Sequence, residues 1–158
     1  MPNAQPRAAV VYHPLKTDLP GLRTAVNRYE ARAGWAKTGW YPTDEADAGI
    51  AATRRALAEG ASLVLASGGD GTVRAVSEVL RGTGVPVAVV PQGTGNLLAR
   101  NLGMPLGDIE EATRAAFFGR NRPIDLGVIT ITRPDEGEDE HVFLVLAGMG
   151  LDARAITA

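Results

Sequence analysis

The chain alternates between short apolar runs, rich in valine and alanine, and longer stretches in which apolar residues recur every three or four positions. The short runs are typical of buried strands, and the longer stretches are typical of helices with one apolar face. The predicted strands lie at 8–12, 35–41, 62–66 and 85–90, and the predicted helices at 17–34, 43–60, 73–80, 94–102 and 108–119. This order predicts an α/β fold with a doubly wound, mostly parallel sheet and flanking helices.

Capping residues mark the ends of several predicted helices. Thr17 or Asp18 begins the first helix and Gly34 ends it, because short polar side chains satisfy free N–H groups and glycine adopts the left-handed conformation that ends a helix. By the same rule, Thr43 or Asp44 begins the second helix, and Asp108 begins the last.

The pattern changes near Arg122. An alternating run at 124–132, a polar turn at 133–140 and an apolar run at 142–146 predict a β-hairpin rather than another strand–helix unit. We therefore expect two domains, at 1–121 and 122–158, the second being the start of a truncated antiparallel domain. We also expect that the chain either self-associates as a homodimer through the hairpin edge or has a disordered tail after about Leu151.

Composition narrows the functional classes. The 158 residues carry a net charge of −2 and contain no cysteine, so thiolate metal sites and disulfides are excluded and nothing favours nucleic-acid binding. The apolar run at 142–151 contains glycines and is about half the length that a bilayer span needs. We expect a cytoplasmic location, with peripheral membrane attachment left open.

Two glycine-rich turns, at 67–72 and 91–96, each follow a predicted strand and open a predicted helix. Backbone N–H groups at a helix N-terminus bind anions, and glycine lets a phosphate approach them closely. The residues predicted to contact phosphate are Gly68, Gly69, Gly71 and Thr72 in the first turn and Gly93, Thr94, Gly95 and Asn96 in the second. Asp70 adds a carboxylate for a metal ion or a proton. Structural roles stay open: Asp70, Thr72 and Thr94 are also suited to capping a helix, and Asn96 to forming a turn.

Neither turn fits the common nucleotide signatures. A dinucleotide fingerprint needs glycine where Leu98 stands, and the chain has no Gly-Lys pair for a P-loop. Four ordered motifs instead carry a resemblance to the diacylglycerol kinase catalytic domain. They are Gly68–Thr72, Pro91–Asn96 with Ala99-Arg100-x-Leu102-Gly103, Ile124–Gly127, and Ala147-Gly148-x-Gly150-x-Asp152-Ala153. The same fold is shared by bacterial lipid kinases and sphingosine kinases and, more distantly, by NAD kinases and phosphofructokinases.

This resemblance implies an enzyme that transfers the γ-phosphoryl group of ATP, with Mg²⁺, to a lipid alcohol such as diacylglycerol. It places ATP between an N-terminal α/β domain and a C-terminal β-sandwich domain, and it implies transient contact with a membrane surface. Asp70 is the expected catalytic residue, as a metal ligand or by orienting the acceptor hydroxyl, and Asp125 is a second expected metal ligand. The general base is expected in the part of the C-terminal domain that this chain lacks, so the chain alone is expected to be an incomplete kinase.

Departures from the family pattern keep alternatives open. His13-Pro14 stands where the family has Asn-Pro, followed by Lys16 and Thr17 as weaker candidates for a phosphate contact. Leu97 stands where an aspartate is common. A soluble-substrate kinase of the NAD-kinase type is one alternative, although the leucine after Asn96 favours the lipid-kinase branch. A nucleotide-binding module without turnover is another.

Overall fold

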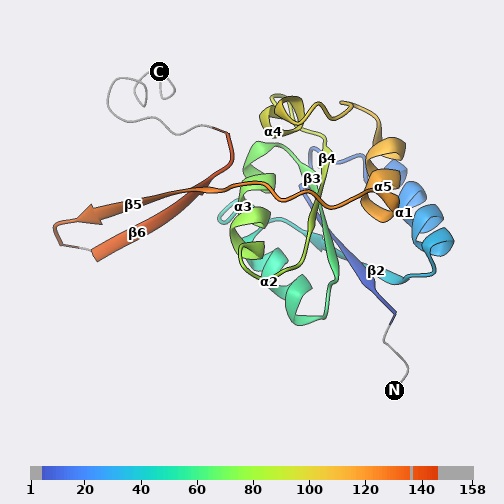
Figure 1. The fold of residues 1–158 in the computed structure, drawn as a ribbon, viewed down its shortest axis with the longest axis horizontal. Coiled ribbons are helices and arrows are strands. Elements are labelled where there is room, and N and C mark those ends of the chain that lie inside the picture. Colours follow the sequence, from blue (N-terminus) through green and yellow to red (C-terminus); the bar gives the residue numbers. More distant parts are fainter. Residues whose placement is uncertain (1–4, 136, 146–158) are drawn as a thin grey trace. The chain divides into compact units, whose positions relative to one another are not determined.

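The computed structural model describes residues 5–135 and 137–145, and it contains a parallel four-stranded sheet followed by an antiparallel strand pair. Figure 1 shows the elements. The strands are β1 (Arg7–Tyr12), β2 (Ala36–Pro42), β3 (Leu63–Gly68), β4 (Val87–Pro91), β5 (Gly127–Arg133) and β6 (Gly137–Phe143). The helices are α1 (Leu19–Ala33), α2 (Ile50–Ala58), α3 (Asp70–Leu80), α4 (Leu97–Asn101) and α5 (Ile109–Phe118). The sheet order β2-β1-β3-β4, all parallel, confirms the predicted doubly wound architecture.

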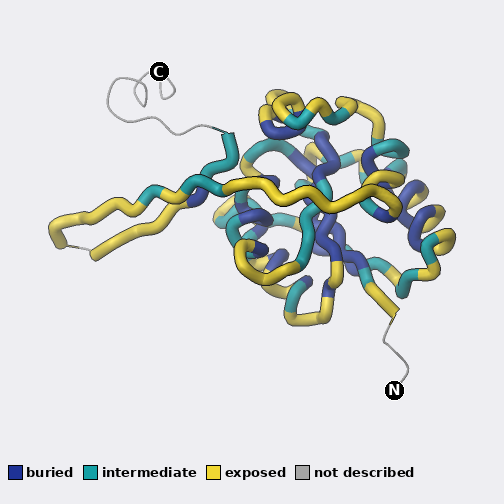
Figure 2. The backbone as a smooth tube through the Cα atoms, viewed as in Figure 1, coloured by how far each residue is buried: buried dark blue, intermediate teal, exposed yellow. Residues whose placement is uncertain are grey.

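The core lies on both faces of this sheet. Strands β1 and β3 are almost wholly buried, as expected for parallel strands covered by helices on each side. Ala8 and Val10 pack toward α1 and α5, in a cluster that includes Leu22, Val26 and Phe117. Helices α2 and α3 cover the opposite face (Figure 1). Figure 2 shows the buried residues concentrated along the strands and the inner sides of these helices.

Helix ends follow the predicted caps at α1 and α5. The side chain of Asp18 accepts a hydrogen bond from the N–H of Gly21, and that of Asp108 accepts one from the N–H of Glu111. Gly34 ends α1 in the left-handed conformation, at a φ of 69°. Trp35 packs edge-on against Phe117 and Trp40 against Tyr12, so both tryptophans belong to the packing of α1, α5 and β1.

The predicted start of the second helix is wrong. Helix α2 begins at Ile50 rather than at Thr43 or Asp44, and turns precede it. Asp47 accepts hydrogen bonds from the N–H groups of Gly49 and Ala51, and these bonds lower the pKa of its carboxyl. Asp47 therefore satisfies the free N–H groups that the prediction assigned to Asp44.

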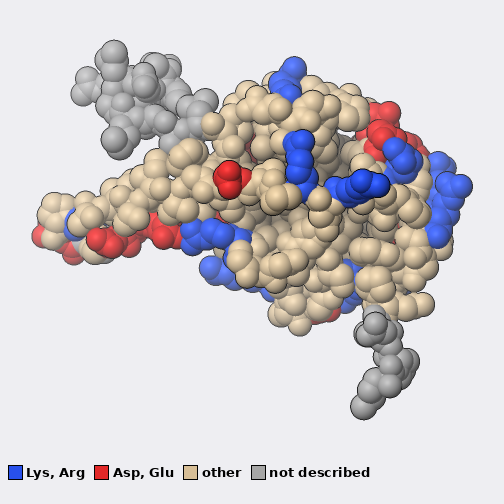
Figure 3. All heavy atoms as spheres, viewed as in Figure 1, with Lys and Arg blue, Asp and Glu red and all other residues tan. Residues whose placement is uncertain are grey.

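The antiparallel pair differs from the predicted hairpin in the residues at which its strands begin. Strand β5 begins at Gly127 rather than at Ile124, so Asp125 precedes the strand. Strand β6 begins at Gly137, so the acidic residues at 138–140, predicted as part of a turn, pair with β5. Figure 3 shows acidic side chains gathered along this hairpin.

By contacts, the chain divides into two compact units, at 1–122 and 123–158, and the hairpin belongs to the second. The predicted motif at 147–153 and the tail after Leu151 lie outside the described residues. Among the described residues, none of the helices has the length and apolar character needed to cross a bilayer.

Candidate nucleotide site

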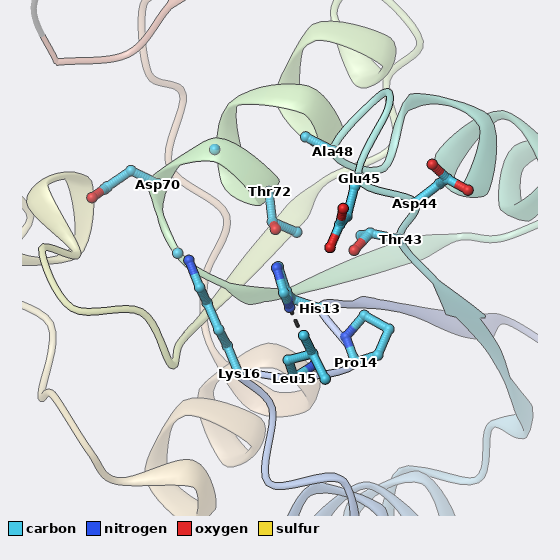
Figure 4. A pocket seen from close by; sticks show the side chains of 12 residues that line it. His13, Pro14, Leu15, Lys16, Thr43, Asp44, Glu45, Ala48, Asp70 and Thr72 are labelled. Carbon is cyan, nitrogen blue, oxygen red and sulfur yellow. Dashed lines mark hydrogen bonds between the residues drawn. The ribbon is translucent and has the colours of Figure 1, made fainter. Parts of the chain in front are cut away.

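Loops that follow three neighbouring strands line a pocket of about 350 Å³ at the carboxyl edge of the parallel sheet (Figure 4). The strand register brings these loops together, because Tyr12 at the end of β1 pairs with both Pro42 and Ser67. The lining residues are His13, Pro14, Leu15, Lys16, Thr43, Asp44, Glu45, Ala48, Gly69, Asp70, Gly71 and Thr72. Ligands of open parallel sheets bind at this edge, where the chain crosses from one side of the first strand to the other.

The first glycine turn forms one wall of the pocket. Gly69 is the N-cap of the 11-residue helix α3 and offers no side chain to the first N–H groups of the helix, which have no intrahelical partners. Thr72 is buried behind the turn, where a Cβ on Gly68 would lie 2.8 Å from its hydroxyl. Gly71 is exposed and helical, and a Cβ built on it meets no atom within 4 Å.

A cation lies next to this wall. Lys16 lines the pocket (Figure 4). Its Nζ lies 3.9 Å from the place of a Cβ on Gly69. Within the described part of the chain, no hydrogen bond or ion pair engages this ammonium group. Beside it, the Nδ1 of His13 accepts a hydrogen bond of 3.2 Å from the N–H of Leu15.

The second glycine turn packs against the first. Gly68 pairs with Pro91 across β3 and β4, and a Cβ on Gly93 would lie 2.4 Å from the Cα of Gly69. Asn96 stabilises the turn from within: its amide donates to the carbonyl of Gly93 and accepts the N–H of the same residue. Its φ of 50° is a left-handed conformation that asparagine tolerates better than most residues. The structure thus brings the two predicted turns into contact.

Asp70 belongs to the first turn, and its side chain lies beside the second. In Figure 4 its carboxylate points away from Thr72 and the other pocket side chains. A Cβ on Gly95 would lie 3.0 Å from Asp70 Oδ2, and Oδ1 accepts a long hydrogen bond of 3.4 Å from the N–H of Leu98 at the start of α4. Asp70 is the first residue of α3, and Gly69 rather than Asp70 is the N-cap of that helix. The described residues contain no group of three or more metal-ligating side chains that could hold an ion.

The other predicted residues lie farther along the chain. Thr94 and Gly95 are exposed in the second turn, and Arg100 donates a hydrogen bond of 2.8 Å to the carbonyl of Gly95. Asp125 is exposed in the second unit, in the irregular segment before β5.

Sequence reasoning assigned no site role to several residues that line the pocket. These residues are His13, Thr43, Asp44 and Glu45, of which Thr43 and Asp44 were predicted only to cap a helix. Each follows directly after β1 or β2. The signal that would have found them is the position of a polar residue at the carboxyl end of a parallel strand, which does not depend on a glycine motif.

Comparison with known proteins agrees with this architecture. Residues 8–129 match the diacylglycerol kinase catalytic domain. The chain is 37% identical over 98 residues to a diacylglycerol kinase of Mycobacterium tuberculosis, covering 62% of this chain and 30% of that protein. It is 34% identical over 131 residues to a diacylglycerol kinase of Bacillus subtilis, covering 78% of this chain and 42% of that protein.

A crystal structure of a diacylglycerol kinase from Bacillus anthracis has the same fold. It superposes with a TM-score of 0.61 at 24% identity, over 81% of this chain and 48% of that chain. The doubly wound sheet with two glycine turns at its carboxyl edge thus defines a kinase-like α/β domain. The chain belongs to the diacylglycerol kinase catalytic domain family, as its motifs predicted. It spans less than half the length of these relatives.

Proposed function

We propose that this chain forms the nucleotide-binding part of an ATP-dependent lipid kinase, which transfers the γ-phosphoryl group of ATP to a lipid hydroxyl such as that of diacylglycerol. The observation that carries the proposal is the pocket wall at the start of α3, where Gly71 and the free ammonium group of Lys16 line the same space. The pocket is within the size range of small-molecule sites, which is about 300–1,000 Å³.

Gly71 has no structural reason to be glycine. It lies in α3, its φ is not positive, and a Cβ would meet open space. Glycine in a helix costs up to about 1 kcal/mol relative to alanine. A ligand that must approach the backbone closely explains this cost, and a phosphate bound by the N–H groups of α3 is such a ligand.

The charges in the pocket suit a polyphosphate. Phosphoryl transfer requires that the attacking and leaving oxygens are aligned and that negative charge is compensated. Lys16 and the α3 N-terminus lie next to each other and both supply positive potential to the pocket. In this proposal they orient the phosphates, while Gly93 to Asn96 border the same site through their contact with Gly69.

We also propose that a magnesium ion binds beside the phosphates. Mg²⁺ in kinases is commonly bound by one or two protein carboxylates, with phosphate oxygens and water as the remaining ligands. Asp70, whose side chain lies beside the second turn, is the carboxylate that we propose for this role. Asp125, the second predicted metal ligand, belongs to the second unit and stays a prediction. The bound ion would neutralise charge on the transferring phosphoryl group.

The lipid acceptor is inferred from the relatives named diacylglycerol kinase. At the pocket mouth, the side chain of Leu15 is 85% exposed next to Lys16. An exposed leucine beside a cation suits transient contact with an anionic membrane surface, where the acceptor would be found. A lipid hydroxyl is therefore the acceptor class that we propose.

The proposal is tested by titrating Mg-ATP into the wild-type chain and into Gly71→Ala by calorimetry. The added methyl group meets no protein atom, so we expect a gain in unfolding free energy of about 0.4–1 kcal/mol. ATP affinity should fall about tenfold or more, because the methyl group occupies the space proposed for a phosphate. A variant that gained stability and bound ATP normally would contradict the proposed phosphate position.

The acceptor class needs a separate assay. Transfer of radiolabelled γ-phosphate to diacylglycerol in mixed vesicles would support the lipid-kinase assignment. Transfer to NAD instead would favour the NAD-kinase-type alternative. ATP binding without transfer, in this chain and in a longer protein that contains it, would favour a nucleotide-binding module.

A further inference from the structure

Gln92, which follows β4, joins three segments of the site. Its backbone N–H donates to the carbonyl of Gly68 at 3.0 Å. Its side-chain Nε2 donates to Ser67 Oγ at 2.8 Å, and its Oε1 accepts the N–H of Asp18 at 2.7 Å. Because the N–H of Asp18 can only donate, it fixes which end of the amide faces α1.

The loop held in this way is the loop that carries Lys16. At its start, the N–H of His13 donates to the carbonyl of Ser67 at 2.9 Å. At its end, the hydroxyl of Thr17 lies 3.1 Å from both the carbonyl and the hydroxyl of Ser67. Gln92 completes the attachment at Asp18, one residue further. Lys16 lies between these fixed points, and its ammonium group has no partner of its own among the described residues.

These contacts determine where the ammonium group of Lys16 lies. Because no other group in the described ranges holds this side chain, its position depends on the position of the Lys16 backbone. The backbone of residues 13–18 is bonded to the end of β3 and, through the Gln92 amide, to the end of β4. The same β3 residues lead directly into the first glycine turn, so the network sets the separation between Lys16 and that turn.

We propose that Gln92 is a positioning residue for nucleotide binding, because its side-chain amide holds the Lys16 loop against the first glycine turn. The inference rests on the proposed function. It adds to it a residue that lines no part of the described pocket and acts through Lys16. If Gln92 only stabilises the end of β4, its substitution should affect ATP binding equally whether or not Lys16 is present.

A double-mutant cycle separates the two roles. Methionine is unbranched and of similar length, so Gln92→Met removes both amide hydrogen bonds with little change in volume. We expect the dissociation constant of Mg-ATP to rise about tenfold in Gln92→Met. In the Lys16→Met background the same change should raise it less than about twofold, since the group being positioned is already absent. Equal effects in both backgrounds would overturn the proposal.

A control variant and a second measurement address stability. Thr113→Val removes a buried hydroxyl that donates 2.7 Å to the carbonyl of Ile109 in α5, a helix that lines no part of the pocket. It should leave ATP affinity unchanged. Without nucleotide, amide exchange at Thr17 and Asp18 should be about tenfold faster in Gln92→Met and unchanged in Thr113→Val. Unchanged exchange in Gln92→Met would overturn the proposal.

The two measurements also keep this inference distinct from the proposed function. A wild-type chain that bound no Mg-ATP would overturn the proposed function and the nucleotide part of this inference. The exchange rates would still show whether Gln92 fixes the Lys16 loop.

Discussion

Single glycines in the two turns meet different physical requirements. Gly93 cannot carry a side chain, because a Cβ would lie 2.4 Å from the Cα of Gly69. The backbone fixes the positions of both atoms, so no side-chain rotation relieves the clash. Gly71, by contrast, has open space around it. The first glycine is explained by packing between the turns, and in our proposal the second is explained by a bound phosphate. A sequence motif alone does not separate these two requirements.

Asp70→Asn tests the metal role of this carboxylate. An asparagine oxygen still accepts the N–H of Leu98, so the fold should be kept while the charge is lost. We expect ATP affinity to fall about tenfold in Mg²⁺ and to change little in EDTA, because a metal ligand acts only when the metal is present. Calorimetry under both conditions measures this difference.

Asp44→Asn is the matched control, since Asp44 lines the same pocket but follows β2. It should leave the magnesium dependence intact. An equal loss of affinity for Asp70→Asn with and without Mg²⁺ would argue against metal ligation and would favour a role in the packing of the two turns.

The glycine turns of the candidate site were predictable from sequence, and its other residues were harder to find. Glycine and aspartate in a short turn carry their own signal, because few other residues fit there. The sequence indicates Lys16 only as a weaker candidate and Thr43 only as a possible helix cap, since an exposed lysine or a threonine occurs in any loop. They enter the pocket because β1 and β2 lie side by side, which is a property of strand order.

The starts of α1 and α5 were predicted correctly, and the starts of α2 and β6 were not. Helices α1 and α5 begin after Asp18 and Asp108, whose side chains satisfy N–H groups in the first turn. Helix α2 was placed too early, because Asp44 and Asp47 both accept nearby N–H groups and the sequence does not distinguish between them. In β6 the acidic residues at 138–140 hid a strand, since its side chains are exposed and lack the apolar alternation that predicts one.

A buried carboxylate of α1 that is bonded to β2 makes the free energy of unfolding depend on pH. Glu30 is 2% exposed, and its carboxylate accepts hydrogen bonds from the ammonium group of Lys37 and from the N–H of Thr38. Burial raises the pKa of this carboxyl, but the hydrogen bonds outweigh burial and hold the pKa below the ordinary value of 4.5. The unfolded chain therefore binds the proton more readily than the folded chain.

Because the folded-state pKa is lowered, we expect the stabilisation from Glu30 to be fully present above about pH 4.5 and to be lost as the pH falls through the folded-state value. Urea unfolding between pH 7 and pH 3 measures it. Glu30→Gln should unfold more easily at pH 7 and lose less stability on acidification. Glu45→Gln, at an exposed carboxylate, is the control and should keep the acid dependence of the wild type. An unchanged dependence in Glu30→Gln would show that other groups cause it.

At the scale of the whole molecule, the apolar core and the candidate pocket both belong to the first unit. Every residue that lines the pocket comes from 13–72, and the core cluster between the sheet and helices α1 and α5 ends at Phe117. The hairpin forms its own contacts, with Gly127 packed against the ring of Phe143. The parts that bind nucleotide in our proposal therefore depend on interactions within a single unit.

This division predicts where a protease cuts. Residues 119–126 have no regular secondary structure and are almost entirely exposed. Most other described lysines and arginines lie in helices or paired strands, and the loop that carries Lys16 is held to Ser67 and Gln92 by hydrogen bonds. Trypsin should cut first after Arg120, because the bond after Arg122 is protected by Pro123. The fragment that ends at Arg120 should keep a cooperative unfolding transition, since the core residues precede the cut. Mass spectrometry of early digestion products and thermal unfolding of the purified fragment measure these outcomes.

The control variant Arg120→Gln should delay the first cut. A first cut within α1 or α3 would mean that the first unit opens more readily than its packing indicates.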